Sequence, residues 1–226
     1  MSTNSLEAAV EFAENPDARC PCVLLLDVSG SMNGAPIDAL NEGLRAFKAD
    51  LSKDALASRR VEVALVAFDH EVVVHHDFST IDYFAPPHLT TREGLTLTGT
   101  AVLKALDMIA ARKAVYKEND ISYYRPWVFL ITDGVPYGED AALFEEAVRR
   151  VHDDEANKRV AFFSVAVEGA DLAVLGRLCS PARPPVKLKG LNFVDMFVWL
   201  SKSAGAVAAS GVDAMVALPA PGWTTV

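Results

Sequence analysis

Several features that would assign this chain to a particular class are scarce or missing. The 226 residues include three cysteines, which are too few and too unevenly spaced for a disulfide framework. Cys20 and Cys22 form a lone C-x-C pair without the second pair that a zinc site needs. The formal net charge is -9 and no basic run occurs, which disfavours binding to the phosphates of a nucleic acid. Reduced thiols of this kind are typical of a cytoplasmic protein.

Signals for membrane insertion, secretion and nucleotide chemistry are also missing. No apolar stretch approaches the roughly 20 residues that span a bilayer. The first residues, MSTNSLEAAVEFAENPDAR, carry acids where a signal peptide has a basic segment and then an apolar one. No P-loop, G-x-G-x-x-G turn or G-x-S-x-G elbow follows a strand candidate. We therefore expect a cytoplasmic protein with no membrane or nucleic-acid partner.

What the sequence does contain is an alternation of strand and helix candidates. Apolar runs at 22–27, 127–132 and 160–167 are typical of strands buried on both faces of a parallel sheet. Runs at 61–68 and 72–76 are separated by three residues, which favours an antiparallel hairpin. Helical spacing and capping residues predict helices at 36–51, 100–113 and 140–153, and after Asp171 and Asn192. The pattern predicts an α/β fold, a doubly wound, Rossmann-like, mainly parallel sheet with one antiparallel edge strand.

The periodic pattern also suggests the limits of the domain. It occupies residues 19–208, so we interpret 1–18 as an N-terminal arm and 209–226, which is rich in Pro, Gly and Ala, as a C-terminal tail. The aromatic-rich segment 116–127 admits two interpretations, a partner-contacting surface or aromatics packed over the edge of the sheet. His75 and His76 are adjacent in a strand and face opposite sides, so they cannot share a metal.

Acidic and hydroxyl side chains follow two of the predicted strands. Asp27, Ser29 and Ser31 come directly after the first strand, and Asp133 ends another. Parallel strands bring their carboxyl ends to one edge of a sheet, so these loops should share a crevice. A third loop precedes a helix and offers Thr96, Thr98 and Thr100, of which Thr100 leads directly into the helix.

The ligand types indicate a hard divalent cation. Oxygen ligands of this number suit Mg²⁺, with Mn²⁺ or Ca²⁺ as alternatives, whereas zinc lacks its usual nitrogen and sulfur ligands here. Three hydroxyls and two carboxylates leave a divalent ion poorly neutralised. The ion would still attract one more carboxylate from outside, so we predict a protein partner that supplies an Asp or Glu.

These residues resemble a known family. The D-x-S-x-S motif at Asp27, Ser29 and Ser31, the separate Thr100 and the strand-ending Asp133 are similar to the metal-ion-dependent adhesion site of von Willebrand factor A domains, over residues 20–208. The resemblance implies that the serines and the threonine bind the metal by their hydroxyls. It implies that the aspartates act directly or through water and that a partner's acid completes the shell.

A narrower resemblance concerns the stretches LLLDVSGSMNGAPIDALNEGL, VALVAFD, WVFLITDGVP and FVDMFVWLSKSAGAV. Together they resemble bacterial TerY-type proteins of tellurite-resistance and stress-response clusters. That likeness implies an associated protein kinase or phosphatase as partner.

The alternative function is that of a metal-dependent hydrolase or phosphatase. A phosphatase of the haloacid dehalogenase type would need a second acid at the position of Ser29, and the sequence offers no obvious general base near the metal. We therefore expect a binding module with no catalytic residues.

Overall fold

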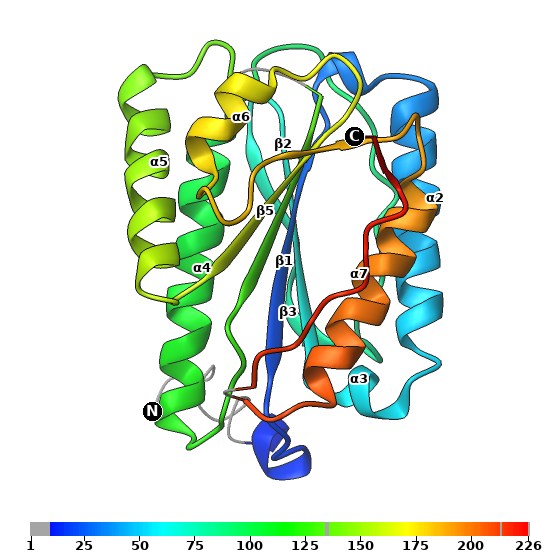
Figure 1. The fold of residues 1–226 in the computed structure, drawn as a ribbon, viewed down its shortest axis with the longest axis vertical. Helices are drawn as coiled ribbons and strands as arrows, with labels where there is room; N and C mark the ends of the chain where they lie inside the picture. The colour runs from blue at the N-terminus through cyan, green and yellow to red at the C-terminus, as the bar shows by residue number, and fades with distance from the viewer. Residues whose placement is uncertain (1–9, 134–135, 213, 226) are drawn as a thin grey trace.

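A seven-stranded sheet forms the centre of the molecule (Figure 1). The computed structural model describes residues 10–133, 136–212 and 214–225. The strand order is β3-β2-β1-β4-β5-β6-β7, in which β3 and β7 are antiparallel to their neighbours and the other pairs are parallel. The strands are β1 (Cys20–Asp27), β2 (Val61–Phe68), β3 (Val72–Thr80), β4 (Trp127–Thr132), β5 (Ala161–Ala166), β6 (Val186–Leu188) and β7 (Thr224–Thr225).

Helices cover both faces of this sheet (Figure 1). One face carries α2 (Ala35–Leu51), α3 (Ala55–Arg60) and α7 (Phe193–Ala208), and the other carries α4 (Thr98–Glu118), α5 (Ala141–Ala156) and α6 (Leu172–Leu178). Side chains along β1 alternate between the two cores, with Leu24 and Leu26 in one and Val23 and Leu25 in the other. The doubly wound α/β fold predicted from the sequence is confirmed.

The structure adds elements that the sequence pattern did not indicate. Helix α3, the 3₁₀ turn η1 (Gly30–Met32), and strands β6 and β7 were not predicted. The sheet thus has a second antiparallel edge, a strand of two residues. Helix α4 also continues past the predicted end at Lys113, where Tyr116 is buried and its ring lies 5.9 Å from that of Phe12.

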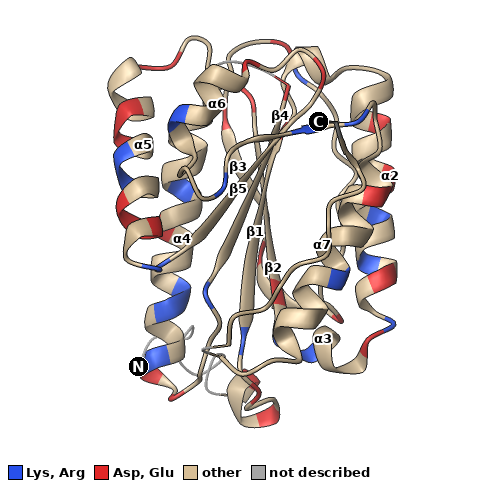
Figure 2. Cartoon of the chain, viewed as in Figure 1, with Lys and Arg blue, Asp and Glu red and all other residues tan. Residues whose placement is uncertain are grey.

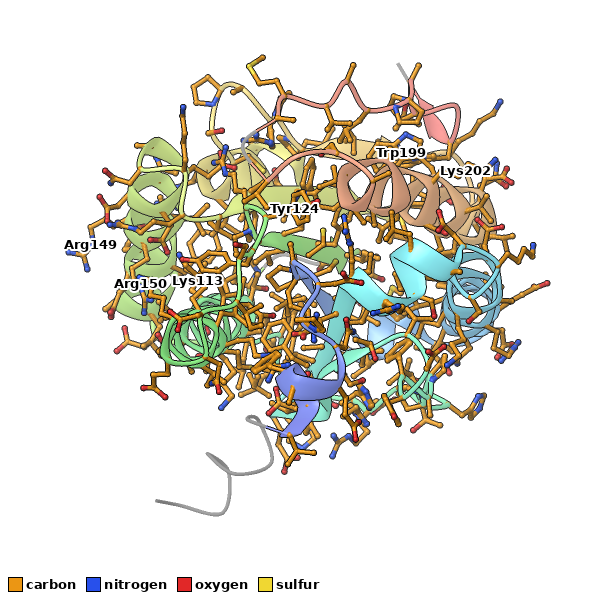
Figure 3. All side chains as sticks on the ribbon, turned by 90° about the horizontal axis from the view of Figure 1, so that it is seen from below. Lys113, Tyr124, Arg149, Arg150, Trp199 and Lys202 are labelled. Carbon is orange, nitrogen blue, oxygen red and sulfur yellow. The ribbon has the colours of Figure 1, made fainter. Side chains whose placement is uncertain are left out.

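Segments outside the predicted core pack against it. Trp223 is buried, its ring lies 5.5 Å from that of Trp199 on α7, and its carbonyl accepts a hydrogen bond from the Lys189 backbone. Figure 3 shows Trp199 and Tyr124, whose hydroxyl donates to the Ala208 carbonyl at 3.1 Å. Tyr124 is itself buried, as are Tyr116 and Trp127, so these aromatics of segment 116–127 pack inward. The boundaries at 18 and 208 stay predictions.

A buried ionic cluster lies where α4 crosses the amino-terminal ends of β1 and β2. Glu62 is fully buried and accepts hydrogen bonds from Arg19 Nε at 2.9 Å, from Arg112 Nε and Nη2 at 2.8 Å each, and from the Tyr116 hydroxyl. Both guanidiniums also lie about the ring of Phe12, at 5.1 and 5.2 Å from its centroid. The cluster ties the residues before β1 to β2 and α4.

Most other charges are at the surface. Figure 2 shows acidic and basic residues interspersed along the longer helices, for example on α5. Among the described residues, no helix is long and apolar enough to cross a membrane.

The caps of α6 and α7 differ from each other. The Asp171 carboxylate accepts hydrogen bonds from the backbone N–H groups of Ala173 and Val174, whereas the Asn192 side chain makes no capping bond. We therefore expect Asp171→Ala to lower the free energy of unfolding by about 1 kcal/mol. Asn192→Ala should change it by less than about 0.5 kcal/mol. Urea unfolding followed by circular dichroism measures both, and equal losses would contradict the assignment of the caps.

Candidate metal centre

The carboxyl ends of β1 and β4 place the predicted acids together. The two strands are parallel neighbours, and Leu26 pairs with Ile131, so Asp27 and Thr132 follow at the same edge of the sheet. Asp27 is fully buried and Ser29 is 3% exposed, whereas Asp133 is half-buried and Ser31 is exposed. The acids and hydroxyls therefore extend from the interior to the surface.

Hydrogen bonds connect four of the five predicted residues. The hydroxyls of Ser29 and Ser31 are 3.1 Å apart, and Ser31 Oγ donates to Asp133 Oδ1 at 2.8 Å. Asp27 Oδ1 accepts from the backbone N–H of Ser29 at 2.9 Å, and Asp27 Oδ2 accepts from the Thr132 hydroxyl. The D-x-S-x-S turn and the end of β4 thus form one connected group of oxygen atoms.

The fifth predicted residue, Thr100, has a different partner. Its hydroxyl donates to Glu139 Oε1 at 2.7 Å, and its backbone N–H donates to the same oxygen at 2.7 Å. Of the three candidate threonines, Thr96 and Thr98 are buried and Thr100 is only partly buried. The Thr98 hydroxyl lies in the interior without a hydrogen-bond partner in the described part of the chain. The accessible hydroxyl is therefore the one at Thr100.

The two aspartates have no cationic neighbour. Burial raises the pKa of Asp27 to about 6, although hydrogen bonds from Thr132 and Ser29 act in the opposite direction. Burial also raises the pKa of Asp133, while the bond from Ser31 lowers it. Within the described residues, no lysine, arginine or histidine pairs with either carboxylate. A divalent cation would supply the missing positive charge.

The spacing of the oxygens suits a small octahedral ion. Metal–oxygen distances of about 2.0–2.1 Å, typical of Mg²⁺, place adjacent octahedral ligands about 2.9 Å apart. The Ser29–Ser31 and Ser31–Asp133 separations of 3.1 and 2.8 Å are close to this value. These side chains could therefore exchange their mutual hydrogen bonds for a metal with little movement.

A third acid close to this edge is already neutralised. Asp69 follows β2 and is fully buried, and its Oδ2 atom lies 2.9 Å from Arg92 Nε. The Arg92 backbone N–H donates to the Val28 carbonyl, which places this residue beside the D-x-S-x-S turn. Asp69 is thus an acid at a strand end with its own cation, in contrast to Asp27.

The family model for the von Willebrand factor type A domain matches residues 22–194. The chain belongs to this family. No curated protein gives a significant match.

Solved structures with this fold are distant in sequence. A von Willebrand factor type A protein from Catenulispora acidiphila is 15% identical, with a TM-score of 0.65 over 84% of this chain and 43% of that one. The von Willebrand factor domain of a type V pili tip protein from Porphyromonas gingivalis is 13% identical, with a TM-score of 0.62 over 86% and 98%. Proximal thread matrix protein 1 of the mussel byssus, with a zinc-occupied adhesion motif, is 13% identical, with a TM-score of 0.56 over 84% and 48%.

These identities show the fold alone. The chain spans less than half the length of the Catenulispora acidiphila chain, and of the mussel protein as well. In this von Willebrand factor A domain, the five metal ligands therefore stay a prediction.

Sequence reasoning missed two residues that contact the predicted ligands. Thr132 lies one position before Asp133, and its hydroxyl donates to Asp27, a contact that the pairing of β1 with β4 could have indicated. Glu139 lies 39 positions after Thr100, and no local pattern connects the two. Among the described residues, no three His, Cys, Asp or Glu side chains lie together as metal ligands would, and three of the five predicted ligands are hydroxyls.

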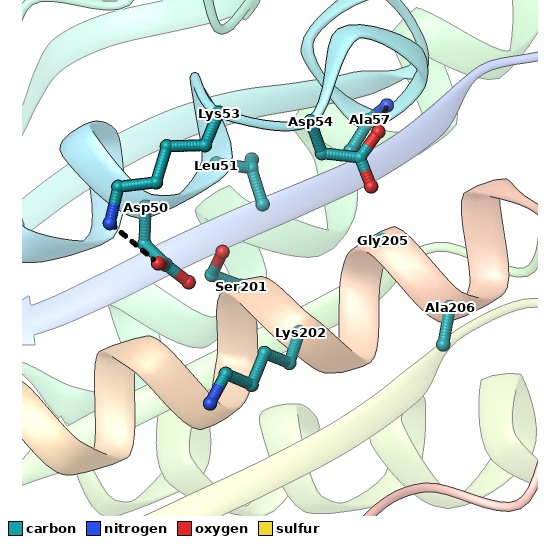
Figure 4. Close-up of a pocket in the computed structure, with 9 residues that line it drawn as sticks. All are labelled: Asp50, Leu51, Lys53, Asp54, Ala57, Ser201, Lys202, Gly205 and Ala206. Atoms are coloured by element: carbon teal, nitrogen blue, oxygen red, sulfur yellow. Dashed lines mark hydrogen bonds and ion pairs between the residues drawn. The ribbon is translucent and has the colours of Figure 1, made fainter.

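A pocket of about 280 Å³ lies elsewhere in this domain, between the α2–α3 turn and α7 (Figure 4). Its two acids have partners, since Asp50 pairs with Lys53 at 3.2 Å and Asp54 caps α3. None of the five predicted ligands lines it. We therefore assign no ligand to this pocket.

Proposed function

We propose that this domain is a metal-dependent protein-binding module that captures an acidic side chain of a partner. The cation would be held by Asp27, Ser29, Ser31, Thr100 and Asp133. The observation that carries the proposal is the connected group of oxygens at the ends of β1 and β4, whose two carboxylates pair with no cationic side chain among the described residues. We infer Mg²⁺ or Mn²⁺, because a compact set of oxygen ligands with only two carboxylates suits a small hard ion better than the larger Ca²⁺.

The open position on the ion supports an acidic partner. Ser31 is exposed and Asp133 is half-buried, so a cation beside them would face solvent. Two carboxylates neutralise a divalent ion only when both bind directly, and the neutral hydroxyls add no charge. A partner's Asp or Glu would therefore be attracted to the ion, although the chain itself carries a net charge of -9.

We infer binding rather than catalysis from the neighbours of the site. The side-chain hydrogen bonds of the five residues, within the described part of the chain, run to serine, threonine and carboxylate groups. A hydrolase would need a group free to accept a proton from a metal-bound water, and the further carboxylate that contacts these residues, Glu139, already accepts hydrogen bonds from Thr100. The four stretches similar to TerY-type proteins support a place in a bacterial tellurite-resistance or stress-response system, with an associated kinase or phosphatase as partner.

Affinity capture tests the proposed function. The immobilised domain is exposed to candidate kinase and phosphatase partners, once in Mg²⁺ and once in EDTA. The Thr100→Ala variant is exposed to the same partners in Mg²⁺. We expect only the unaltered domain in Mg²⁺ to capture the partner. EDTA removes the ion, and Thr100→Ala removes a neutral ligand and disturbs the coordination position that the partner's carboxylate would occupy. Replacing the docking acid of the partner by its amide should weaken binding by about 2 kcal/mol or more.

Thr91→Ala is the matched control. The Thr91 hydroxyl donates to Asn33 at 3.2 Å in the loop beside the site and is not a proposed ligand. This variant should capture the partner as the unaltered domain does. Equal capture in Mg²⁺, in EDTA and by Thr100→Ala would show that recognition uses another surface.

A further inference from the structure

Glu139 makes three hydrogen bonds to the first turn of α4. Its Oε1 atom accepts from the hydroxyl and the backbone N–H of Thr100, and its Oε2 atom accepts from the backbone N–H of Gly99 at 2.8 Å. Two of these donors are backbone groups at the start of a 21-residue helix, which have no partner within the helix. The third is the hydroxyl of a predicted metal ligand.

The surrounding backbone holds Glu139 in this position. Thr96 and Tyr137 exchange two backbone hydrogen bonds, of 2.9 and 3.2 Å, which align the loop before α4 with the segment before α5. Gly138 then turns the chain with φ of 72°, where a side chain would also collide with Leu95. The Asp140 side chain begins α5 directly afterwards by accepting from Ala142.

The starts of α4 and α5 are also in close contact. A Cβ atom at Gly99 would lie 2.6 Å from the Cα atom of Phe144 on α5, so only glycine fits there. Phe144 is itself buried. The packing of the start of α4 against α5 therefore fixes the distance between Thr100 and Glu139.

From this geometry we infer that Glu139 is a positioning residue for the metal site, acting through Thr100. The inference rests on the proposed function. A hydroxyl has one proton and two lone pairs, and Glu139 takes the proton. The oxygen of Thr100 then presents only lone pairs toward the other ligands, and the hydrogen bond to a carboxylate makes that oxygen a stronger electron donor to a cation. In this role Glu139 does not touch the ion.

Mn²⁺ titration followed by electron paramagnetic resonance tests the inference. Glu139→Gln is expected to weaken Mn²⁺ binding about 10- to 100-fold, the usual effect of removing a partner of a metal ligand. Asp140→Asn is the matched control, since it removes the same charge one residue away and leaves Thr100 alone. That variant should weaken binding no more than about twofold, the size of a solvent-screened charge effect.

A double-mutant cycle decides how Glu139 acts. In a Thr100→Ala background, Glu139→Gln should cause almost no further loss of Mn²⁺ affinity, because its target hydroxyl is gone. Full additivity would overturn the inference, since Glu139 would then bind the ion itself. Tighter Mn²⁺ binding by Glu139→Gln would also overturn it, since the carboxylate would then hold Thr100 away from the ion.

Two controls separate this inference from the proposed function. Thermal unfolding in EDTA shows whether each variant is folded, and any loss of helix capping lowers the melting temperature without acting on Mn²⁺ affinity. If Asp27→Asn abolishes Mn²⁺ binding and Glu139→Gln does not change it, only the role of Glu139 is wrong. If neither variant changes binding, the metal site itself is wrong.

Discussion

Asp27→Asn is expected to abolish specific Mn²⁺ binding while the protein stays folded. Asparagine has the same shape as aspartate but lacks the charge that holds a divalent cation. Asp27 is fully buried with its pKa raised to about 6, so the ionised carboxylate is unfavourable in the metal-free protein. The variant should therefore unfold in EDTA at the same temperature as the unaltered protein or a higher one. Calorimetric titration with Mn²⁺ and thermal unfolding measure the two effects.

The metal-free protein is itself expected to be folded. The hydroxyls and carboxylates of the site are hydrogen-bonded to one another, and both hydrophobic cores lie beneath them. Added Mg²⁺ should then stabilise the fold only by RT ln(1 + [L]/Kd). Asp140→Asn should bind Mn²⁺ nearly as the unaltered protein does. Unchanged Mn²⁺ affinity of Asp27→Asn would falsify the assignment of Asp27, and loss of structure in EDTA would show that the ion is structural.

Glu62→Ala is expected to cause the largest loss of stability, about 3–5 kcal/mol or complete unfolding. Glu62 is the common acceptor for Arg19 and Arg112, and removing it leaves a fully buried guanidinium of Arg19 without its ion pair. The Tyr116 hydroxyl loses its acceptor at the same time. Urea unfolding at equilibrium measures the change. Mn²⁺ affinity should not change in any fraction that folds, because the cluster lies at the opposite end of β1.

Glu145→Ala provides the comparison for a surface pair. Glu145 and Arg177 form an ion pair between α5 and α6, and their side chains are 53% and 50% exposed. Its loss should cost less than about 1 kcal/mol, because water solvates both groups when they separate. Similar losses for Glu62→Ala and Glu145→Ala would mean that the buried cluster contributes no more than an exposed pair.

The sheet and its main helices were predictable because their signals are local. Burial on both faces makes β4 apolar throughout, and the predicted range 127–132 is the observed one. The stripe from Ile37 to Leu51 likewise predicts α2. In contrast, β7 has only two residues and exists because Trp223 packs beside Trp199. A contact between distant segments leaves no periodicity in either of them.

In the candidate site, too, some contacts could be predicted from local signals and others could not. Ser29, Ser31 and Asp133 could be placed together because residues that follow parallel strands share an edge of the sheet, and the structure does bring them together. Glu139 could not, because its contact with Thr100 depends on the packing of α4 against α5. The D-x-S-x-S motif also does not reveal that Asp27 is fully buried, whereas Ser31 is exposed.

Both edges of the sheet are poor templates for an added strand. At one edge, β3 pairs with β2 through shifts of register around Leu65, and it carries the exposed residues His75 and Asp77. At the other edge, β7 offers only two residues. An extended peptide would find few backbone groups in line to bind. Such edges also limit the edge-to-edge pairing by which sheets of two copies of the domain could join.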